Sequence, residues 1–465
     1  MDLIVSLKTG KARQHPQRLV YTGALLLLLG GCLLAARTVY SGLLGLGRLG
    51  YRRYAQHAES GPSSRCDAAA CQLPACLCSG AAVPGGLDAR LVPQAVALGV
   101  QGVVDEATYV GVRALLANRS TPSGCPARAT FFVSHVQPAA PDVGDASPGG
   151  GGAAGKLRCT NYFRVQLLRS QGHEIAASGL TYRLPPRWWS ANATYMDWVE
   201  EAAGVRETLR AFASILESDV VGFRAPFLEQ GGDTQFQALY DLNFKYEASL
   251  TASRDSTSRD PPLWPYTLDF RSTQDCGAHL CPVNSFPGLW VLPQPEYGAI
   301  NGRPVFHISE RLRAGHGQVY RLLMRSFHRH YNLNRAPFVV SLSSSCFSGT
   351  GRAVAVLREV EQFLDHLAAY KDVYLVPVSK VIAWLSRPTM LEDIAHFPPW
   401  RCRDGGALPP ACSEGDVTVC YYDEANALIS GLMPVFANAN IFKKLVSCVT
   451  PCPPFFPWFG NPNGQ

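Results

Sequence analysis

The chain has 465 residues, enough for one large folded domain or two ordinary ones. Hydrophobic residues make up 47% and charged residues 17%, which is a globular composition. The net charge of +6 is spread over this whole length, and no basic stretch is interleaved with aromatic residues. The composition therefore argues against a nucleic-acid-binding protein.

Residues 19–36, LVYTGALLLLLGGCLLAA, form an uncharged run of 18 residues, which is long enough to span a bilayer. The apolar centre of a cleaved signal peptide is shorter, at about 7–15 residues. We therefore predict a transmembrane signal-anchor, with 1–18 as a cytoplasmic tail and 37–65 as a stalk. The protein would be a single-pass type II membrane protein with a lumenal or extracellular body. The alternative is a secreted protein that is cleaved after this run.

The cysteines are concentrated after this run, since all of the fifteen except Cys32 follow it. Close spacings, as in CDAAACQLPACLC (66–78), indicate disulfide bonds in an oxidising compartment. A zinc site in that cluster is the less favoured alternative, because the second cysteine pair lacks the two-residue spacing of a zinc knuckle and no histidine pair follows. The disulfide candidates are Cys66, Cys71, Cys76, Cys78, Cys125, Cys276, Cys281, Cys402, Cys412, Cys420, Cys448 and Cys452.

Two N-glycosylation sequons agree with a lumenal or extracellular body. They are Asn118-Arg119-Ser120 and Asn192-Ala193-Thr194. We predict that Asn118 and Asn192 carry glycans.

From residue 129 onward, short β-branched or aromatic runs alternate with amphipathic stretches. We expect strands at 129–133, 173–178, 220–226, 244–250, 338–344 and 373–379, and helices at 195–216 and 352–369. This alternation predicts a parallel α/β fold closed into a barrel. Residues 137–156 are poor in bulky apolar side chains and are predicted to be a disordered loop inserted into the fold. The Cys- and Pro-rich segment after Trp400 is predicted to fold back as disulfide-pinned coil.

Several segments, in this order, resemble the polysaccharide deacetylase superfamily and its animal chitin deacetylase-like branch. Among them are GCPARATFFVSH, GHEIAASGLTYRLP, GFRAPFLEQGGDTQF, FPGLW, RHYNLNRAPF and DVYLVPVSKVIAW. The resemblance covers 66–455 and leaves 456–465 as a tail. It implies a distorted (β/α) barrel of about seven strands with disulfide-rich N- and C-terminal extensions. It also implies that active relatives hold a divalent metal, usually zinc, at the carboxyl ends of the strands.

In active members of that family, two consecutive aspartates supply a base and a metal ligand. Two histidines complete the metal site, and a late histidine protonates the leaving amine. The metal polarises the acetamide and acidifies a bound water. The corresponding positions in this chain are Gln101, Gly102, Ser178, Tyr182 and Ser343. None of these is a base, an acid or a good zinc ligand, so the resemblance implies a degenerate active site, a pseudoenzyme, with no cofactor expected.

An active enzyme is the competing hypothesis. Asp105 and Glu106 would replace the lost carboxylates if the alignment slid by four residues, and the chain would be a metal-dependent deacetylase of N-acetylated polysaccharide with non-standard ligands. Both imidazoles would still be absent. Cys346 is a further candidate ligand, although a buried thiol or a disulfide with Cys159 is the favoured explanation for it.

The binding groove is the feature that we expect to survive. Arg224 matches an arginine that orients the catalytic aspartate in active relatives. Without that aspartate, it would form a structural ion pair with Glu229 or Asp233, or bind a sugar carboxylate or sulfate. Phe227 and Trp290 are the other predicted substrate-binding residues. The predicted partner is a protein or a glycan, such as an N-acetylglucosamine polymer.

Overall fold

A computed structural model describes residues 65–138, 157–252, 260–276, 280–309, 312–349, 351–402, 409–422 and 443–465. Residues 62–465 form one compact unit. The predicted cytoplasmic tail, the 19–36 run and nearly all of the stalk lie outside the described residues. Within the described part of the chain, no helix is both long and apolar enough to cross a membrane.

The main sheet has nine strands and is built around β1, whose nine residues are all buried. Its strands follow the order β14-β1-β2-β5-β6-β7-β10-β9, and β15 also pairs with β1. Parallel strands that are covered on both faces are buried along their whole length, and every residue of β1, β2 and β14 is buried. The strands are β1 (Gln94–Gly102), β2 (Thr130–Val133), β5 (Glu174–Ala177), β6 (Gly222–Phe223), β7 (Tyr246–Glu247), β9 (Tyr266–Leu268), β10 (Phe286–Val291), β14 (Phe338–Ser343) and β15 (Val373–Leu375).

One strand breaks the parallel pattern that we predicted, since β9 runs antiparallel to β10. The described residues that connect the two strands include no helix, and the connection contains the Cys276–Cys281 disulfide. An antiparallel neighbour needs no long crossover, so strand–helix alternation does not reveal it. In the described residues, the hydrogen-bonded path runs from β14 to β9 and does not join its two ends. The α/β fold is therefore confirmed, whereas closure into a barrel of about seven strands stays a prediction.

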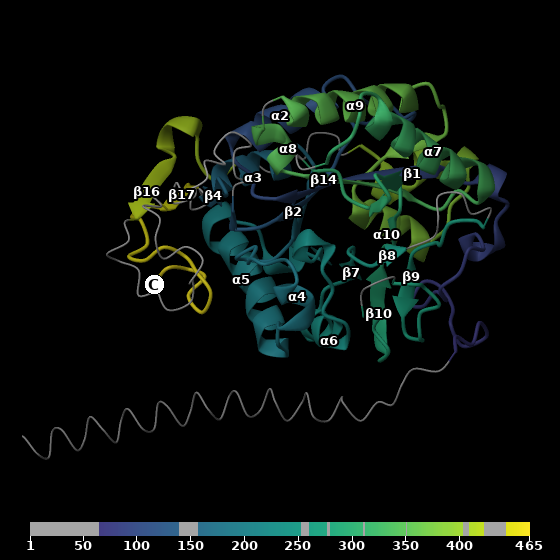
Figure 1. The fold of residues 1–465 in the computed structure, drawn as a ribbon, viewed down its shortest axis with the longest axis horizontal. Helices are drawn as coiled ribbons and strands as arrows, with labels where there is room; N and C mark the ends of the chain where they lie inside the picture. Colours follow the sequence, from purple (N-terminus) through teal and green to yellow (C-terminus); the bar gives the residue numbers. More distant parts are fainter. Residues whose placement is uncertain are drawn as a thin grey trace, which may run out of the picture. The chain divides into compact units, whose positions relative to one another are not determined.

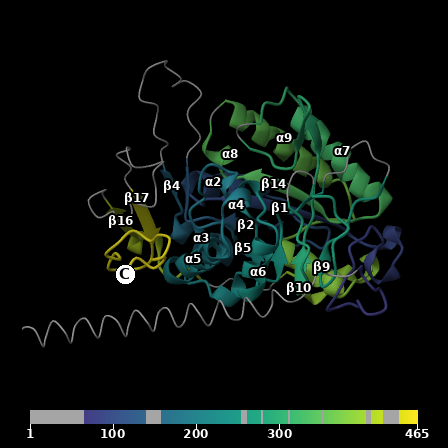
Figure 2. The ribbon, with the colours of Figure 1, turned by 60° about the horizontal axis from the view of Figure 1, so that its bottom comes forward.

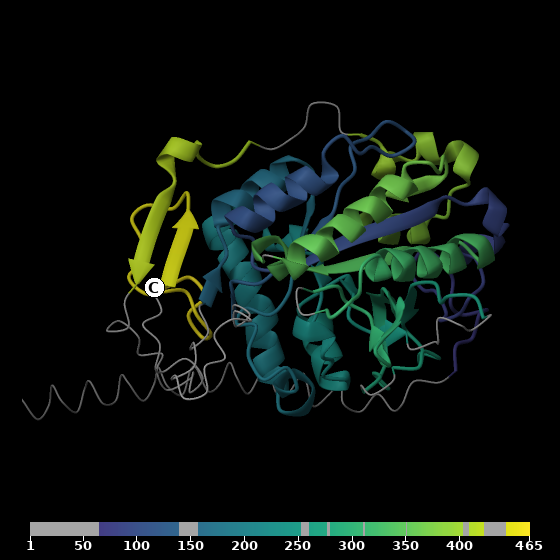
Figure 3. The same cartoon turned by 45° about the horizontal axis from the view of Figure 1, so that its top comes forward.

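Helices cover the sheet on two sides (Figures 1 and 3), with α2, α7, α8 and α9 on one side and α4, α5 and α6 on the other. The predicted helix at 195–216 is α5, which begins with a capping box between Thr194 and Asp197. The helices are α2 (Glu106–Leu116), α3 (Tyr162–Ser170), α4 (Trp188–Ala191), α5 (Tyr195–Ala213), α6 (Asp233–Asp241), α7 (Gln318–Leu333), α8 (Ser345–Ser348), α9 (Arg352–Leu367) and α10 (Val378–Ser386). Short 3-10 helices span Pro84–Gly86, Ala89–Leu91, Glu217–Asp219, Pro226–Leu228, Leu391–His396, Pro398–Trp400 and Glu414–Asp416.

Four two-stranded sheets lie outside the main sheet. They pair β3 (Val136–Pro138) with β4 (Leu157–Cys159), β8 (Thr251–Ala252) with β11 (Gln294–Pro295), β12 (Gly298–Ile300) with β13 (Arg303–Val305), and β16 (Thr418–Tyr422) with β17 (Lys443–Ser447). The β16–β17 hairpin lies next to α3 and β4, on the side of the sheet away from β9 and β10 (Figure 2).

Two predicted boundaries are corrected. Gln137 and Pro138, which we assigned to a disordered loop, belong to β3, and the rest of that loop lies outside the described residues. The segment 456–465 is not a separate tail, because Phe456 and Trp458 are each only 3% exposed. The Phe456 ring lies 4.7 Å from the His135 ring. Burial of these two rings attaches the end of the chain to the domain.

Disulfide bonds are present, as predicted. All twelve candidate cysteines are paired, as Cys66–Cys78, Cys71–Cys76, Cys125–Cys402, Cys276–Cys281, Cys412–Cys448 and Cys420–Cys452. The first two bonds use all four cysteines of the 66–78 cluster, so these thiols cannot serve as zinc ligands. Cys159 carries a free thiol, which excludes the alternative of a Cys159–Cys346 bond.

Candidate functional site

The carboxyl ends of β1, β5 and β14 bring together three of the five degenerate positions. Gln101 is the ladder partner of Ser343, and its Nε2 donates to Ser178 Oγ over 3.0 Å. The same Nε2 donates to the backbone oxygen of Ala225 at 2.8 Å, and Ser178 Oγ donates to that of Arg224 at 2.8 Å. The amide of Gln101 and the hydroxyl of Ser178 thus hold the chain that leaves β6.

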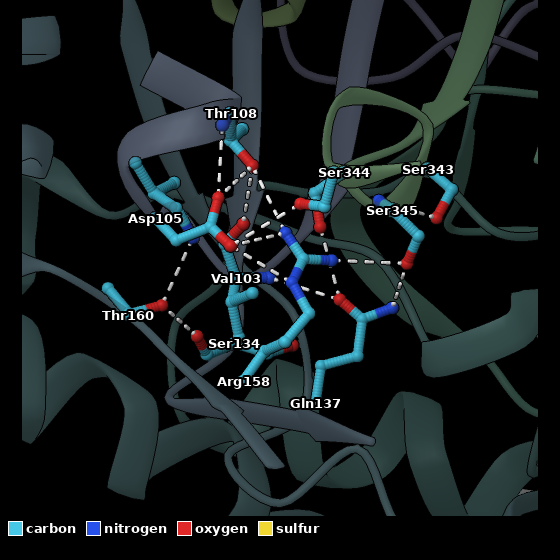
Figure 4. Close-up of polar contacts among 12 residues, drawn as sticks. Val103, Asp105, Thr108, Ser134, Gln137, Arg158, Thr160, Ser343, Ser344 and Ser345 are labelled. Atoms are coloured by element: carbon cyan, nitrogen blue, oxygen red, sulfur yellow. Dashed lines mark hydrogen bonds and ion pairs between the residues drawn. The ribbon is translucent and has the colours of Figure 1, made fainter. Parts of the chain in front are cut away.

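Gly102 is the position that we matched to the metal-binding aspartate of the resembled family, and the ends of two other side chains fill the space beside it. Its φ of +119° is one that L residues rarely adopt. A Cβ at this position would overlap Gln137 Oε1 and lie 2.6 Å from Ser344 Oγ. Gln137 Oε1 accepts from Val103 N at 3.3 Å and from Ser344 Oγ at 3.1 Å (Figure 4). The carboxamide of Gln137 therefore occupies the space that a carboxylate at 102 would need.

The remaining two positions are also engaged in structural contacts. Tyr182 is buried with φ +49°, and its ring packs 4.5 Å from the Phe227 ring. Ser343 Oγ accepts a hydrogen bond from Ser345 N at 3.2 Å. Since each of these groups is neutral and has a structural contact, no acid or base remains at the five positions.

The two carboxylates of the competing hypothesis have structural partners. Asp105 caps the start of α2 by accepting from Thr108 N at 3.0 Å, and it forms an ion pair of 2.7 Å with Arg158. Arg158 also reaches Asp105 through its Nε at 3.0 Å, which makes the pair two-pronged (Figure 4). Glu106 pairs with Arg164 at 2.7 Å. A carboxylate held in this way is a poor candidate for a catalytic base.

Sequence reasoning missed the polar network that fills this end of the sheet. Gln137 Nε2 donates to Ser345 Oγ at 3.3 Å, and Arg158 Nη1 donates to the same oxygen at 3.2 Å. Gln137 and Arg158 stand at the two borders of the segment that we expected to be a disordered loop. No local pattern distinguishes them, because their partners lie about 50 to 200 residues away in the chain.

The residues present at this end of the sheet do not fit a zinc ion. Zinc in proteins takes imidazole, thiolate or carboxylate ligands, whereas the positions that we matched to the family's ligands carry glycine, serine and tyrosine. Among the residues that the structure describes, the only three-residue cluster of potential metal ligands is Cys66, Cys71 and Cys78, which form disulfides. No catalytic step through a metal follows from this donor set.

Arg224 is fully buried, so it cannot bind a sugar acid as we considered. Its Nε donates to Ala248 O at 2.9 Å, its Nη1 donates to Ser341 Oγ at 2.9 Å, and its guanidinium lies 4.0 Å from the centre of the Phe132 ring. Burial lowers the pKa of Arg224 to about 10. His307 Nδ1 lies 2.9 Å from Ser341 Oγ, and burial, together with the nearby Arg224 charge, lowers the pKa of His307 to about 3.

The predicted ion pairs of Arg224 are not formed. Glu229 accepts from Ser190 Oγ at 2.6 Å, and Asp233 accepts from Val283 N and Asn284 N at 2.9 Å each. Arg224 uses a carbonyl and a hydroxyl instead.

Of the other two predicted binding residues, only Phe227 is accessible. Trp290 is 5% exposed and packs in a buried cluster with Phe132 and Trp264, so it does not line an open groove. Phe227 is half-buried and has φ +59°. A second ring, Trp188, is also half-buried, and the guanidinium of Arg183 lies 4.2 Å from its centre. Phe227 and Trp188 are therefore the aromatic groups that a ligand could reach here.

Glu201, on α5, holds the loop that carries Ser178 and Tyr182. Its carboxylate accepts from Thr181 N at 2.9 Å and from Thr181 Oγ1 at 2.5 Å. Glu201 is 1% exposed, and this burial raises its pKa to about 7.

Comparisons with known proteins identify the class. The chain is 31% identical over 404 residues to chitin deacetylase 8 of Bombyx mori, covering 86% of this chain and 93% of that protein. It is 30% identical over 415 residues to chitin deacetylase 1 of Bombyx mori, covering 86% and 68% respectively. A crystal structure assigned to the polysaccharide deacetylases, from Mycobacterium smegmatis, superposes with a TM-score of 0.40 at 15% identity and covers 66% of this chain and 94% of its own. No profile of a known protein family matches.

These relatives assign the protein to a family of polysaccharide deacetylases. Within that superfamily, the chain belongs to the animal chitin deacetylase-like branch.

The filled space at Gly102 leads to a mutational prediction. We expect Gly102→Asp to lower the free energy of unfolding by about 3 kcal/mol, because the side chain overpacks against Gln137 and strains a positive φ. Adding Gln137→Ala should recover about 1 kcal/mol in a double-mutant cycle, measured by denaturant unfolding. Gly86→Asp is the matched control, because Gly86 also has positive φ but nothing within 4 Å of its Cβ position. Equal effects at Gly102 and Gly86 would contradict a filled site.

The raised pKa of Glu201 predicts a pH dependence of stability. The folded-state pKa lies near 7 and the ordinary value is 4.5, so the folded state binds the extra proton between these values. The contribution of protonated Glu201 to the free energy of unfolding is fully present below pH 4.5, and it is lost as the pH rises through 7. Relative to Glu201→Gln, the wild type should gain about 2–3 kcal/mol between pH 8 and pH 5.

The measurement is the unfolding free energy of both proteins at several pH values. Buried neutral histidines act in the opposite direction, but they are present in both proteins and cancel in the difference. Glu361→Gln, at an exposed position on α9, controls for the removal of a carboxylate. If the difference in unfolding free energy between the wild type and Glu201→Gln does not change with pH, the raised pKa of Glu201 is refuted.

Proposed function

We propose that this chain is a catalytically inactive chitin deacetylase-like protein. The observation that carries the proposal is the carboxamide of Gln137, which fills the space that a metal-binding aspartate at position 102 would need. In this proposal, the degenerate site lacks metal ligands, and the hydrogen bonds of Gln137 to Val103 and Ser344 occupy its space.

The chemistry of deacetylation supports the same conclusion. Hydrolysis of an acetamide requires polarisation of its carbonyl and a base that activates water. The side chains of Gln101 and Ser178 are neutral and bound to backbone oxygens, and Asp105 is paired with Arg158. The alternative is an active deacetylase that uses Asp105 with other ligands, and this ion pair argues against it.

The retained role that we propose is binding of an N-acetylated glycan at the carboxyl ends of β5 and β6. Two half-buried aromatic rings, Phe227 and Trp188, follow these strands. Partly exposed aromatic rings suit contact with the apolar faces of sugars. Both relatives are named chitin deacetylases, which supports an amino-sugar polymer as the ligand class. A protein partner on the same surface is the other candidate.

We further propose that the protein is a type II membrane protein with a glycosylated lumenal or extracellular body. The uncharged run at 19–36 supports the anchor. Six disulfides support an oxidising compartment. Asn118 and Asn192 are both exposed, as glycan acceptors must be.

The proposed function predicts binding without turnover. The full-length protein in non-ionic detergent, supplied with excess zinc, should release no more acetate from hexa-N-acetylchitohexaose than a heat-denatured sample. Calorimetric titration should detect binding, and Phe227→Ala should weaken it about five- to tenfold through loss of ring contact. Phe455→Ala, at an exposed aromatic position in the C-terminal segment, is the control. Acetate release that Asp105→Asn abolishes would instead establish the alternative enzyme.

The proposed topology predicts two behaviours in secretory cells. Asn118→Gln and Asn192→Gln should each make the protein run faster in gel electrophoresis, by the shift that the loss of one N-glycan causes. After extraction with alkaline carbonate, the protein should remain in the membrane pellet. Release into the medium with a mature amino terminus after residue 36 would support the secreted alternative.

A further inference from the structure

A cavity of 960 Å³ opens at the amino ends of the parallel strands, which is the opposite end of the sheet from the candidate site. Its walls come from the residues before β2, β5 and β6 and from those after β15. The titratable groups that face it include Arg128, Arg169, His173, Asp219, Lys380 and Arg401. No family position discussed above belongs to it.

The charge of this cavity is predominantly positive. It contains four cationic side chains and two carboxylates, Asp219 and Glu174. Asp219 is paired with Arg169. Glu174 accepts from Thr130 Oγ1 at 2.8 Å and from Ser379 N at 2.9 Å, and its burial raises its pKa. These partners leave the charges of Arg128 and Arg401 uncompensated by the carboxylates of the wall.

Arg128 is the central group. It is half-buried, donates to Ala127 O at 3.1 Å, and lies over Gly172, where a Cβ would be 3.2 Å from its Nε. Within the described ranges, no carboxylate lies within ion-pair distance of its guanidinium. Burial lowers the pKa of Arg128. A partly desolvated cation without a counter-ion is costly, and an oxyanion ligand would relieve that cost.

His173 adds a neutral donor to the same wall. Its Nδ1 accepts from Ala129 N at 3.1 Å, so the ring proton is on Nε2. Burial lowers the pKa of His173 to about 3, and the neighbouring Arg128 charge acts in the same direction. A neutral imidazole that donates beside a guanidinium suits a second oxygen of the same anion.

Covalent and hydrogen bonds hold part of the wall of this cavity. The Cys125–Cys402 disulfide links the segment before β2 to the segment after Trp400, and both cysteines face the cavity. Trp400 Nε1 donates to Lys380 O at 2.8 Å, and Lys380 Nζ donates to Pro399 O. A pre-formed wall reduces the entropy that a ligand must lose on binding.

We propose that this cavity binds an acidic saccharide, whose sulfate, phosphate or carboxylate group is held by Arg128 and His173. Ligand cavities for small organic molecules typically measure about 300–1,000 Å³, so this one is larger than a bare oxyanion requires. Its apolar lining, which includes Ile175, Ile215 and Val221, suits the apolar face of a sugar ring. The inference does not depend on whether the opposite end of the sheet binds a neutral glycan.

The test is a calorimetric titration of the full-length protein in non-ionic detergent at low salt. The probes are N-acetylglucosamine 6-sulfate, its 6-phosphate and glucuronic acid, with neutral N-acetylglucosamine and inorganic sulfate as comparisons. We expect saturable binding of at least one acidic sugar, which weakens with added sodium chloride. Arg128→Gln should reduce that affinity about tenfold, and Arg128→Lys should reduce it less. Arg321→Gln, at an exposed position on α7, should leave it unchanged.

The outcomes separate clearly. No saturation by any acidic sugar up to about 10 mM, or equal affinity for the neutral sugar, would overturn the proposal. Equal affinity for inorganic sulfate and sugar sulfate would overturn the saccharide part of it. If Arg128→Gln does not fold, as judged by its thermal melting curve, Arg401→Gln, at an exposed cation of the same cavity, takes its place and should also weaken binding. The proposed glycan at Phe227 is neutral, so Phe227→Ala should bind the acidic sugars with the same affinity as the wild type. That result distinguishes the two sites.

Discussion

The buried guanidinium of Arg224 is the constraint on which the interior of this sheet depends. A cation without access to water is costly unless its donors find acceptors. Arg224 has a carbonyl after β7 for its Nε, the hydroxyl of Ser341 on β14 for its Nη1 and the face of Phe132 on β2, whereas its Nη2 has no hydrogen-bond partner in the described part of the chain. The strands that flank the site are thereby tied to one side chain. The neighbouring His307 is kept neutral mainly by its own burial, and the Arg224 charge beside it lowers its pKa further.

The sequence predicts the regular elements better than it predicts their polar contacts. The apolar runs that became β2, β5 and β14, and the helical periodicity of α5 and α9, are local patterns that burial enforces. The antiparallel strand β9 has no such pattern. The replacement of the expected aspartates and histidines could be predicted from the sequence, because the resemblance gives the spacing at which these residue types should occur.

The filling of the site could not be predicted in this way. Gln137 reaches Gly102, Ser344 and Ser345 through the fold, and nothing in its own neighbourhood marks it. Trp290 was misassigned for a related reason: a resemblance places a residue on a strand but does not decide which face of the strand it uses. Loss of catalytic residues alone would leave an empty pocket that a few substitutions could restore. The polar network around Gln137 adds contacts that such a reversal would also have to displace.

The Cys125–Cys402 bond has a consequence for biosynthesis. The partners are 277 residues apart, whereas Cys71 and Cys76 are separated by 5 and Cys66 and Cys78 by 12. Chains are made at about 5–20 residues per second, so Cys125 waits roughly tens of seconds after its synthesis for its partner. During that interval, its thiol is available to other cysteines and to oxidoreductases. Completion of the covalent framework is thus one of the last events in the maturation of this protein.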